Sequence, residues 1–389
     1  MFFLFLNMAC LHRSPEVSKP KLMTQYFPSE AKSGLDQRLL KSIPGSSLDR
    51  NLTMAAHHLL AALKKRTAHI TVQAGSLAAA KAGYPGQTRY AKLMNRGDFP
   101  QALIKTVLLD ANGDKVDVAL VSKRYSDGGV LWLIAWSHRI MDMDPIPRQV
   151  SLDKPVALRI DLNGGDRASL YVSPPGGTVR ELSIVPNAHR WVNALNTPGA
   201  YRFEVVVSRE KGTQIGALFS VFVDAPPPDM PELTTSHPRL PALKEIEDEL
   251  HLELNDLRKR RGLAPLKRFR LFEPLARQHS KMMAYTGLVA HKIPGVGAGV
   301  PSMASELAHP RAEFFENVAA SFSVREIMDL TIDSPGHLST LLCEECTHVS
   351  IGAAVESKKT RHPRVFVTWE MMRFPQGQPR VIQRLAPKR

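Results

Sequence analysis

A proline-dense stretch past the middle of the chain constrains the fold most strongly. Residues 224–241 read DAPPPDMPELTTSHPRLP. Proline fixes φ and lacks a backbone N–H, so neither a helix nor a central strand can run through this stretch. We therefore predict a semi-rigid linker over residues 225–241. The 389 residues leave room for about one folded region on each side of it.

Before the linker, the hydrophobic period changes near residue 100. Helical spacing of Leu59, Leu60 and Leu63 predicts a short helical segment over 52–99. Short apolar runs between turn residues then follow, without an intervening helical pattern. They include VLWLIAW (130–136), PVALRIDL (155–162), RASLYVS (167–173), YRFEVVV (201–207) and IGALFSVFV (215–223). About seven such strands predict an immunoglobulin-like β-sandwich domain over residues 100–224.

Three tryptophans fall within this predicted sandwich. They are Trp132, Trp136 and Trp191. Large aromatic side chains in strand patterns usually pack inside, so we expect all three in the core and not at a ligand. The predicted sandwich shows no group of residues that suggests a functional site.

The first 51 residues are predicted to be a mostly disordered leader. The opening MFFLFLNMACLHR is apolar for about 11 residues, too short to span a bilayer. It also lacks a basic residue before the apolar run, so it is at most an atypical secretory signal. Ser, Pro and Lys dominate residues 12–50 without sustained periodicity. No later segment is long and apolar enough to suggest a transmembrane span.

The chain is strongly basic. Its 51 Lys and Arg residues exceed its 37 Asp and Glu residues by 14, and the last residues, 376–389, form a basic tail. Such a charge attracts polyanions such as nucleic acid, acidic glycans or anionic lipid head groups, and charge alone does not select one of them. Aromatic residues make up 7% of the chain, without the interleaving of aromatic and basic residues that stacks bases. Specific nucleic-acid binding is therefore not expected.

The three cysteines do not form a disulfide scaffold. Cys343 and Cys346 flank two glutamates just before a strand pattern, whereas a thioredoxin-like CxxC would open a helix. They either pair locally or remain two buried thiols, and a metal clip with His348 is the third alternative. Cys10 is left over.

Helical patterns return after the linker. Apolar residues at helical spacing predict helices from about 246 to 261 and from 274 to 286. Ser323 with Glu326, and Ser334 with Pro335, are capping signals for two further helices. Residues 347–357 and 364–372 alternate as two strands. His279 lies on the inward stripe of its helix, and we interpret it as a core histidine.

Taken in order, these segments resemble the CAP superfamily of cysteine-rich secretory, antigen 5 and pathogenesis-related proteins. The resemblance covers residues 244–373, in the compact bacterial form of the family. The motifs are LNDLRKRRGLAPL, LARQHSKMMAYTGLVAH, ENVA, SPGH, THVSIGAAV and VFVTWEMM. It implies an α/β/α sandwich over a domain at 242–375, in a protein that is secreted or associated with the cell envelope.

The resemblance also implies a cleft with two histidines and two glutamates, which binds a divalent cation in some members. Three positions match, at His291, Glu316 and His337. The second Glu position is Ser334, with Asp333 beside it, and Asn317 is a further neighbour of the cleft. The Gly-rich loop 294–300 departs from the family pattern. Two imidazoles and a carboxylate are the ligand set of a catalytic zinc, but they could equally hydrogen-bond one another without metal.

Three functions fit these residues. A secreted or envelope-associated binding module would act through the His/Glu cleft, with or without a divalent cation such as zinc. A metal-dependent hydrolase would use water bound to a metal at His291, Glu316 and His337, because no serine lies in a nucleophile context. A cationic structural module would dock on anionic envelope polymer.

Overall fold

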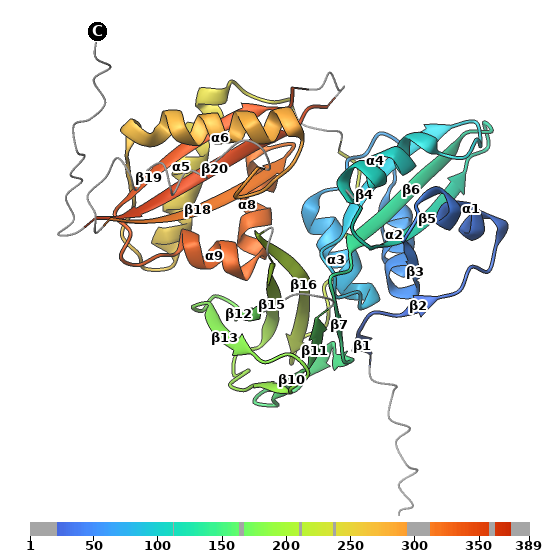
Figure 1. The fold of residues 1–389 in the computed structure, drawn as a ribbon, viewed down its shortest axis with the longest axis horizontal. Coiled ribbons are helices and arrows are strands. Elements are labelled where there is room, and N and C mark those ends of the chain that lie inside the picture. The colour runs from blue at the N-terminus through green and yellow to red at the C-terminus, as the bar shows by residue number, and fades with distance from the viewer. Residues whose placement is uncertain are drawn as a thin grey trace, which may run out of the picture.

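A computed structural model describes residues 22–111, 113–162, 167–209, 212–235, 239–293, 312–357 and 362–374. In chain order, these residues form an N-terminal unit, a β-rich middle unit and a C-terminal unit, coloured blue to red in Figure 1. The first 21 residues, the loop at 294–300 and the basic tail at 376–389 lie outside the described residues.

The N-terminal unit places helices on both faces of a five-stranded sheet with the order β2-β3-β5-β6-β4. Leu59 of α2 packs with Leu133 of β6 on one face, while Val107 of α4 packs with Trp136 on the other. The unit contains β1 (Met23–Thr24), β2 (Pro28–Ser29), α1 (Gly34–Ser42), β3 (Ser47–Asp49), α2 (Arg50–Ala62), α3 (Val72–Ala82), β4 (Arg89–Asn95), α4 (Gln101–Ala111), β5 (Val116–Arg124) and β6 (Val130–His138).

This unit corrects two expectations about the start of the chain. The predicted disordered leader is wrong for residues 22–51, which contain helix α1 and three short strands. Ser33 caps α1 by accepting a hydrogen bond from the Asp36 N–H at 3.1 Å. One of the serines that led us to predict disorder is therefore a helix cap. The predicted helical segment at 52–99 also ends in a strand, β4.

The middle unit is smaller than the predicted sandwich over 100–224. The run VLWLIAW pairs with β4 and β5 in the N-terminal sheet, and residues 101–111 are helical. A five-stranded sheet, β13-β12-β15-β16-β9, forms one core with short paired strands, and an immunoglobulin-like topology is not confirmed. The strands are β7 (Met141–Met143), β8 (Ile146–Pro147), β9 (Gln149–Val150), β10 (Val156–Leu158), β11 (Ile160–Leu162), β12 (Arg167–Ser173), β13 (Arg180–Ile184), β14 (Arg190–Val192), β15 (Gly199–Arg209) and β16 (Gly212–Val223).

Of the three tryptophans predicted to lie in the core, two are buried and one is exposed. Trp132 and Trp136 are buried in the N-terminal unit, where their indole N–H groups donate to Asn95 and Asp110. Trp191, on the short strand β14, is 56% exposed, so the expectation that it lies in the core is wrong. A two-stranded pair covers too little area to bury an indole on both faces.

The described part of the predicted linker, 225–235 and 239–241, contains no helix and only one isolated bridge. That bridge joins Leu233 to Leu63, at the end of α2. Hydrogen bonds from the Leu233 N–H to the Ala62 carbonyl (2.9 Å) and from the His69 N–H to the Thr235 carbonyl (2.7 Å) extend the contact. The linker is therefore attached to the N-terminal unit over part of its length.

The C-terminal unit is a four-stranded sheet with the order β17-β19-β20-β18 between helices. Helices α5, α8 and α9 pack on the face that carries Trp369, and Met283 of α6 packs on the opposite face with Phe366. The unit contains α5 (Leu243–Arg260), β17 (Lys267–Arg268), a 3₁₀ turn (Arg270–Phe272), α6 (Glu273–Thr286), β18 (Glu313–Ser321), α8 (Val324–Asp333), α9 (Pro335–Leu341), β19 (His348–Val355) and β20 (Val365–Arg373).

The four predicted helices and two strands of this unit are confirmed. Ser323 caps α8 by accepting from the Glu326 N–H, and Ser334 caps α9 by accepting from the His337 N–H, with Pro335 in the first turn. Among the described residues, no helix combines the length and the apolar character that a membrane span requires.

Candidate functional site

Two of the three predicted cleft residues touch directly. His291 follows the C-terminal end of α6, and its Nδ1 lies 2.8 Å from Oε1 of Glu316 on β18. The Glu316 side chain is 3% exposed, whereas that of His291 is 47% exposed. A buried carboxylate is thus paired with a half-exposed imidazole.

His279 is a second imidazole partner of Glu316. Its Nδ1 lies 3.1 Å from Oε2 of Glu316, within ion-pair distance. The ring orientation does not give a hydrogen bond, however, and both atoms lack a hydrogen-bond partner among the described residues. We therefore regard the His291 contact as the firmer one. His279 is buried, as the interpretation of it as a core histidine predicts. That interpretation did not include the contact of this ring with Glu316.

Glu370 is a second buried carboxyl group at the site. It lies opposite Glu316 in the pairing of β18 with β20, and neither of its carboxyl oxygens has a partner in the described parts of the chain. Burial raises the pKa of Glu370 well above its ordinary value, and the nearby Glu316 adds to this effect. Burial also opposes ionisation of Glu316, but His279 and His291 outweigh it and lower the pKa of Glu316. The pKa values of the two acids are therefore shifted in opposite directions.

The sequence of this unit matches a known family. Residues 252–370 match the model of the cysteine-rich secretory protein family, CAP. The C-terminal unit is a CAP domain. The family assignment rests on this match of the sequence. A search of curated proteins finds no match for the chain.

Three solved structures are similar to parts of the chain. They are an outer surface protein from Borrelia burgdorferi (19% identity, 34% of this chain and 95% of that one, TM-score 0.29), an extracellular protein containing a SCP domain from Bacillus anthracis (16%, 60% and 86%, TM-score 0.29) and a cysteine-rich secretory protein from Staphylococcus aureus (11%, 60% and 82%, TM-score 0.26). TM-scores this low do not establish a shared fold over the aligned lengths.

The third predicted cleft residue, His337, lies in the first turn of α9 in the CAP domain. The Asn317 amide donates to the His337 carbonyl at 2.9 Å, which fixes the backbone from the β18 side. Burial lowers the pKa of His337 to about 4, and the charge of His291 contributes. At neutral pH the His337 ring is therefore uncharged and keeps a lone pair for a ligand.

Two further predicted neighbours, Ser334 and Asp333, bond to the middle unit. The Ser334 hydroxyl donates to Glu204 of β15 at 2.8 Å, and Asp333 pairs with Arg202 of the same strand at 3.3 Å. Both belong to the contact between the CAP domain and the middle unit. Asn317 supports the His337 backbone.

The cysteine prediction is resolved in favour of local pairing. Cys343 and Cys346 form a disulfide. The alternative of two free thiols is therefore wrong, and so is the metal clip with His348, which would need thiolates as ligands. Across the described residues, no three His, Cys, Asp or Glu side chains are close enough together to hold a metal ion.

Glu370 is the site residue that reasoning from the sequence did not single out. A signal was present, because VFVTWEMM contains one acidic residue in an otherwise apolar strand. A charged residue in such a strand is costly to bury without a role. Its pairing with Glu316 could not be read from the sequence, because 54 residues separate the two strand positions (370 − 316).

Proposed function

We propose that the protein is a binding module that acts through the His/Glu cleft of its CAP domain, and that a divalent cation suits this cleft as a ligand. The observation that carries the proposal is a set of buried polar atoms without partners among the described residues. They belong to His279, Glu316 and Glu370. Buried polar atoms are costly to leave unpaired, so a ligand that satisfies them binds favourably.

The charge states at the cleft support a cation. Glu316 is ionised because its pKa is lowered, and His337 is neutral because its pKa is about 4. Cations require deprotonated ligands of this kind. His291, Glu316 and His337 would hold the cation, but the described side chains do not yet converge on one point. Cation binding therefore requires these side chains to rearrange.

We also infer that the protein works outside the cytosol, in a secreted or envelope-associated form. The Cys343–Cys346 disulfide supports this location, because disulfides persist in oxidising compartments. The net charge of +14 would then favour contact with anionic envelope polymer.

A metal-dependent hydrolase is the second candidate. Neighbouring carboxyl groups with pKa values shifted in opposite directions, as in Glu316 and Glu370, are typical of acid–base sites. In that case the cation would supply an activated water. Glu370, which lies opposite Glu316 on the neighbouring strand, would hold a proton. Turnover that a chelator abolishes would favour this candidate over a pure binding module.

Calorimetric titration of the full chain with zinc tests the proposal. We expect the wild type to bind, and the variants His291→Ala and His337→Ala to lose measurable binding, since each removes one of three donors. His189→Ala is the matched control, because the His189 side chain is exposed in the middle unit, away from the cleft. Unchanged zinc binding in both cleft variants would overturn cation binding and leave the histidines with a hydrogen-bonding role.

A further inference from the structure

A carboxylate from the middle unit enters the CAP domain at the start of α9. Glu204 lies on β15 and is 1% exposed. Its Oε1 accepts from the Ser334 hydroxyl at 2.8 Å, and its Oε2 accepts from the Gly336 N–H at 2.6 Å. In Figure 1, helix α9 (orange) lies where the CAP domain meets the green strands of the middle unit.

These bonds continue to the cleft. The Ser334 oxygen that donates to Glu204 also accepts from the His337 N–H, at 3.3 Å. The Glu204 carboxylate is therefore two hydrogen bonds from the backbone of His337. On the other side, Asn317 donates to the carbonyl of the same residue. The first turn of α9 is held between a strand of the CAP domain and a strand of the middle unit.

The fit between β15 and α9 is close. A Cβ added at Gly336 would lie 3.0 Å from Oε2 of Glu204, so the glycine is needed for the carboxylate to approach this near. Arg202, two residues earlier on the same face of β15, donates to the Asp333 carbonyl at 3.2 Å. The Ser220 hydroxyl on β16 accepts from Arg202 at 2.8 Å and fixes its direction.

A contact between two domains does not require a buried carboxyl group. Apolar residues would bury the same surface without the desolvation cost of Glu204. A carboxyl group also fixes the orientation of its partner, because its two oxygens accept hydrogen bonds from two defined donors of one helical turn. Both donors lie within three residues of His337.

We propose that Glu204 is a positioning residue for the predicted CAP cleft: it fixes the first turn of α9 and so sets the position of the His337 ring. The cleft is then incomplete without the middle unit. The inference rests on the proposed function only in treating this cleft as the site, and it does not depend on whether a cation binds there.

Histidine ring signals in the NMR spectrum of the full chain, labelled at histidine, test this role. The variant Glu204→Ala should shift the His337 ring signals, which are assigned by their loss in His337→Gln. It should also speed exchange of the Gly336 amide about tenfold, since the buried N–H loses its hydrogen-bond acceptor. Glu204→Gln keeps one acceptor oxygen and should restore the signals in part. Asp161→Ala, an exposed position on β11 of the middle unit, is the matched control.

His251 on α5 is the internal reference for these spectra, because it bonds the Leu266 carbonyl within the CAP domain. A general loosening of the domain would move the His251 signals as well, whereas loss of positioning moves those of His337 alone. If Glu204→Ala does not fold, Gly336→Ala should give a smaller shift of His337, because its added methyl displaces the carboxylate. Unchanged His337 signals in a folded variant of either kind, or equal shifts at His251, would overturn the proposal. Zinc titration of the wild type is independent of this result.

Discussion

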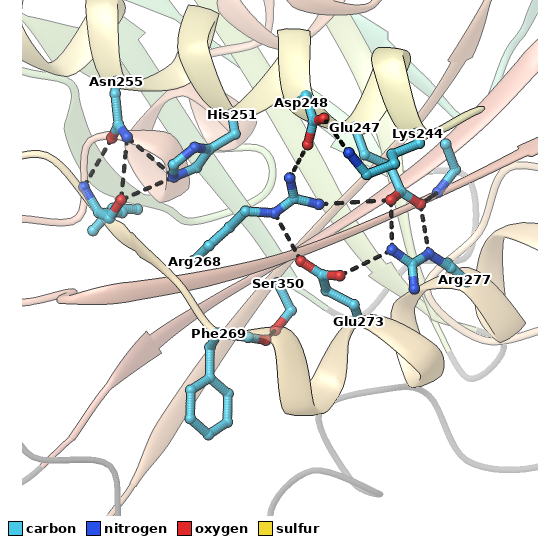
Figure 2. A network of polar contacts seen from close by, with 12 residues as sticks. Lys244, Glu247, Asp248, His251, Asn255, Arg268, Phe269, Glu273, Arg277 and Ser350 are labelled. Carbon is cyan, nitrogen blue, oxygen red and sulfur yellow. Dashed lines mark hydrogen bonds and ion pairs between the residues drawn. The ribbon is translucent and has the colours of Figure 1, made fainter. Parts of the chain in front are cut away.

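Helix α6 takes part in two polar clusters that differ in how completely their charges are paired. Near its start, Glu273 and Arg277 belong to a network with Glu247, Asp248 and Arg268, shown in Figure 2. Further along, His279 belongs to the cleft with Glu316 and Glu370. Helix α6 thus contributes side chains to a network of paired charges and to a group with unpaired buried oxygens.

In the network of Figure 2, each buried carboxylate meets a guanidinium group. Arg277 donates to both oxygens of Glu247, at 2.8 and 2.6 Å, and the Ala353 N–H adds a bond at 3.1 Å. In the cleft, Glu370 lies beside another acid, and its oxygens have no partner within the described ranges. The difference predicts that the network stabilises the fold, and it agrees with the ligand binding that we propose for the group around Glu316.

The largest effect should follow from breaking the network. Glu247→Ala would remove one of the two buried carboxylates that Arg277 and Arg268 contact, and Glu247 is 1% exposed. We expect a loss of about 1.5–3 kcal/mol in the free energy of unfolding, the usual range for lost hydrogen bonds to charged groups. Urea denaturation measures this. Glu249→Ala, an exposed position on the same helix, should leave the midpoint nearly unchanged. Equal midpoints for the two variants would contradict a stabilising role for the network.

A smaller effect, visible in its pH dependence, should follow from changing the cleft. Because the pKa of Glu370 is raised, the folded state keeps a proton that the unfolded chain releases near pH 4.5. This contribution to stability is full below pH 4.5 and is lost as the pH rises toward the folded pKa. Glu370→Gln cannot titrate, so its unfolding free energy should fall less over this range than that of the wild type. Parallel pH curves for the two proteins would show that Glu370 does not keep its proton in the fold.

Local patterns predicted the CAP domain well. Helix stripes at Ile246 and Leu250, the Ser323 and Ser334 caps and the Gly287 stop each depend on neighbours within a few residues. The contact between His291 and Glu316 followed from the family motifs and is present in the structure.

The remaining features depended on how helices and sheets pack against each other, which local sequence patterns do not specify. The run VLWLIAW is apolar throughout because helices cover both faces of β6, and a continuous apolar run does not distinguish this from a sandwich core. Glu204 and Ser334 are 130 residues apart, and no local pattern records that they meet. The Glu204 contact thus depends on the packing of two units, which periodicity does not specify.

Zinc binding by Glu316→Gln and Glu273→Gln, measured by calorimetry on the full chain, tests the distinction between the two clusters most directly. Both substitutions remove one buried carboxylate charge next to α6 and retain the side-chain shape, and circular dichroism verifies that each variant is folded. The account predicts that Glu316→Gln loses zinc binding, while Glu273→Gln binds as the wild type does. It would be contradicted by a wild-type chain that does not bind zinc, by Glu316→Gln binding like the wild type, or by an equal loss in both variants.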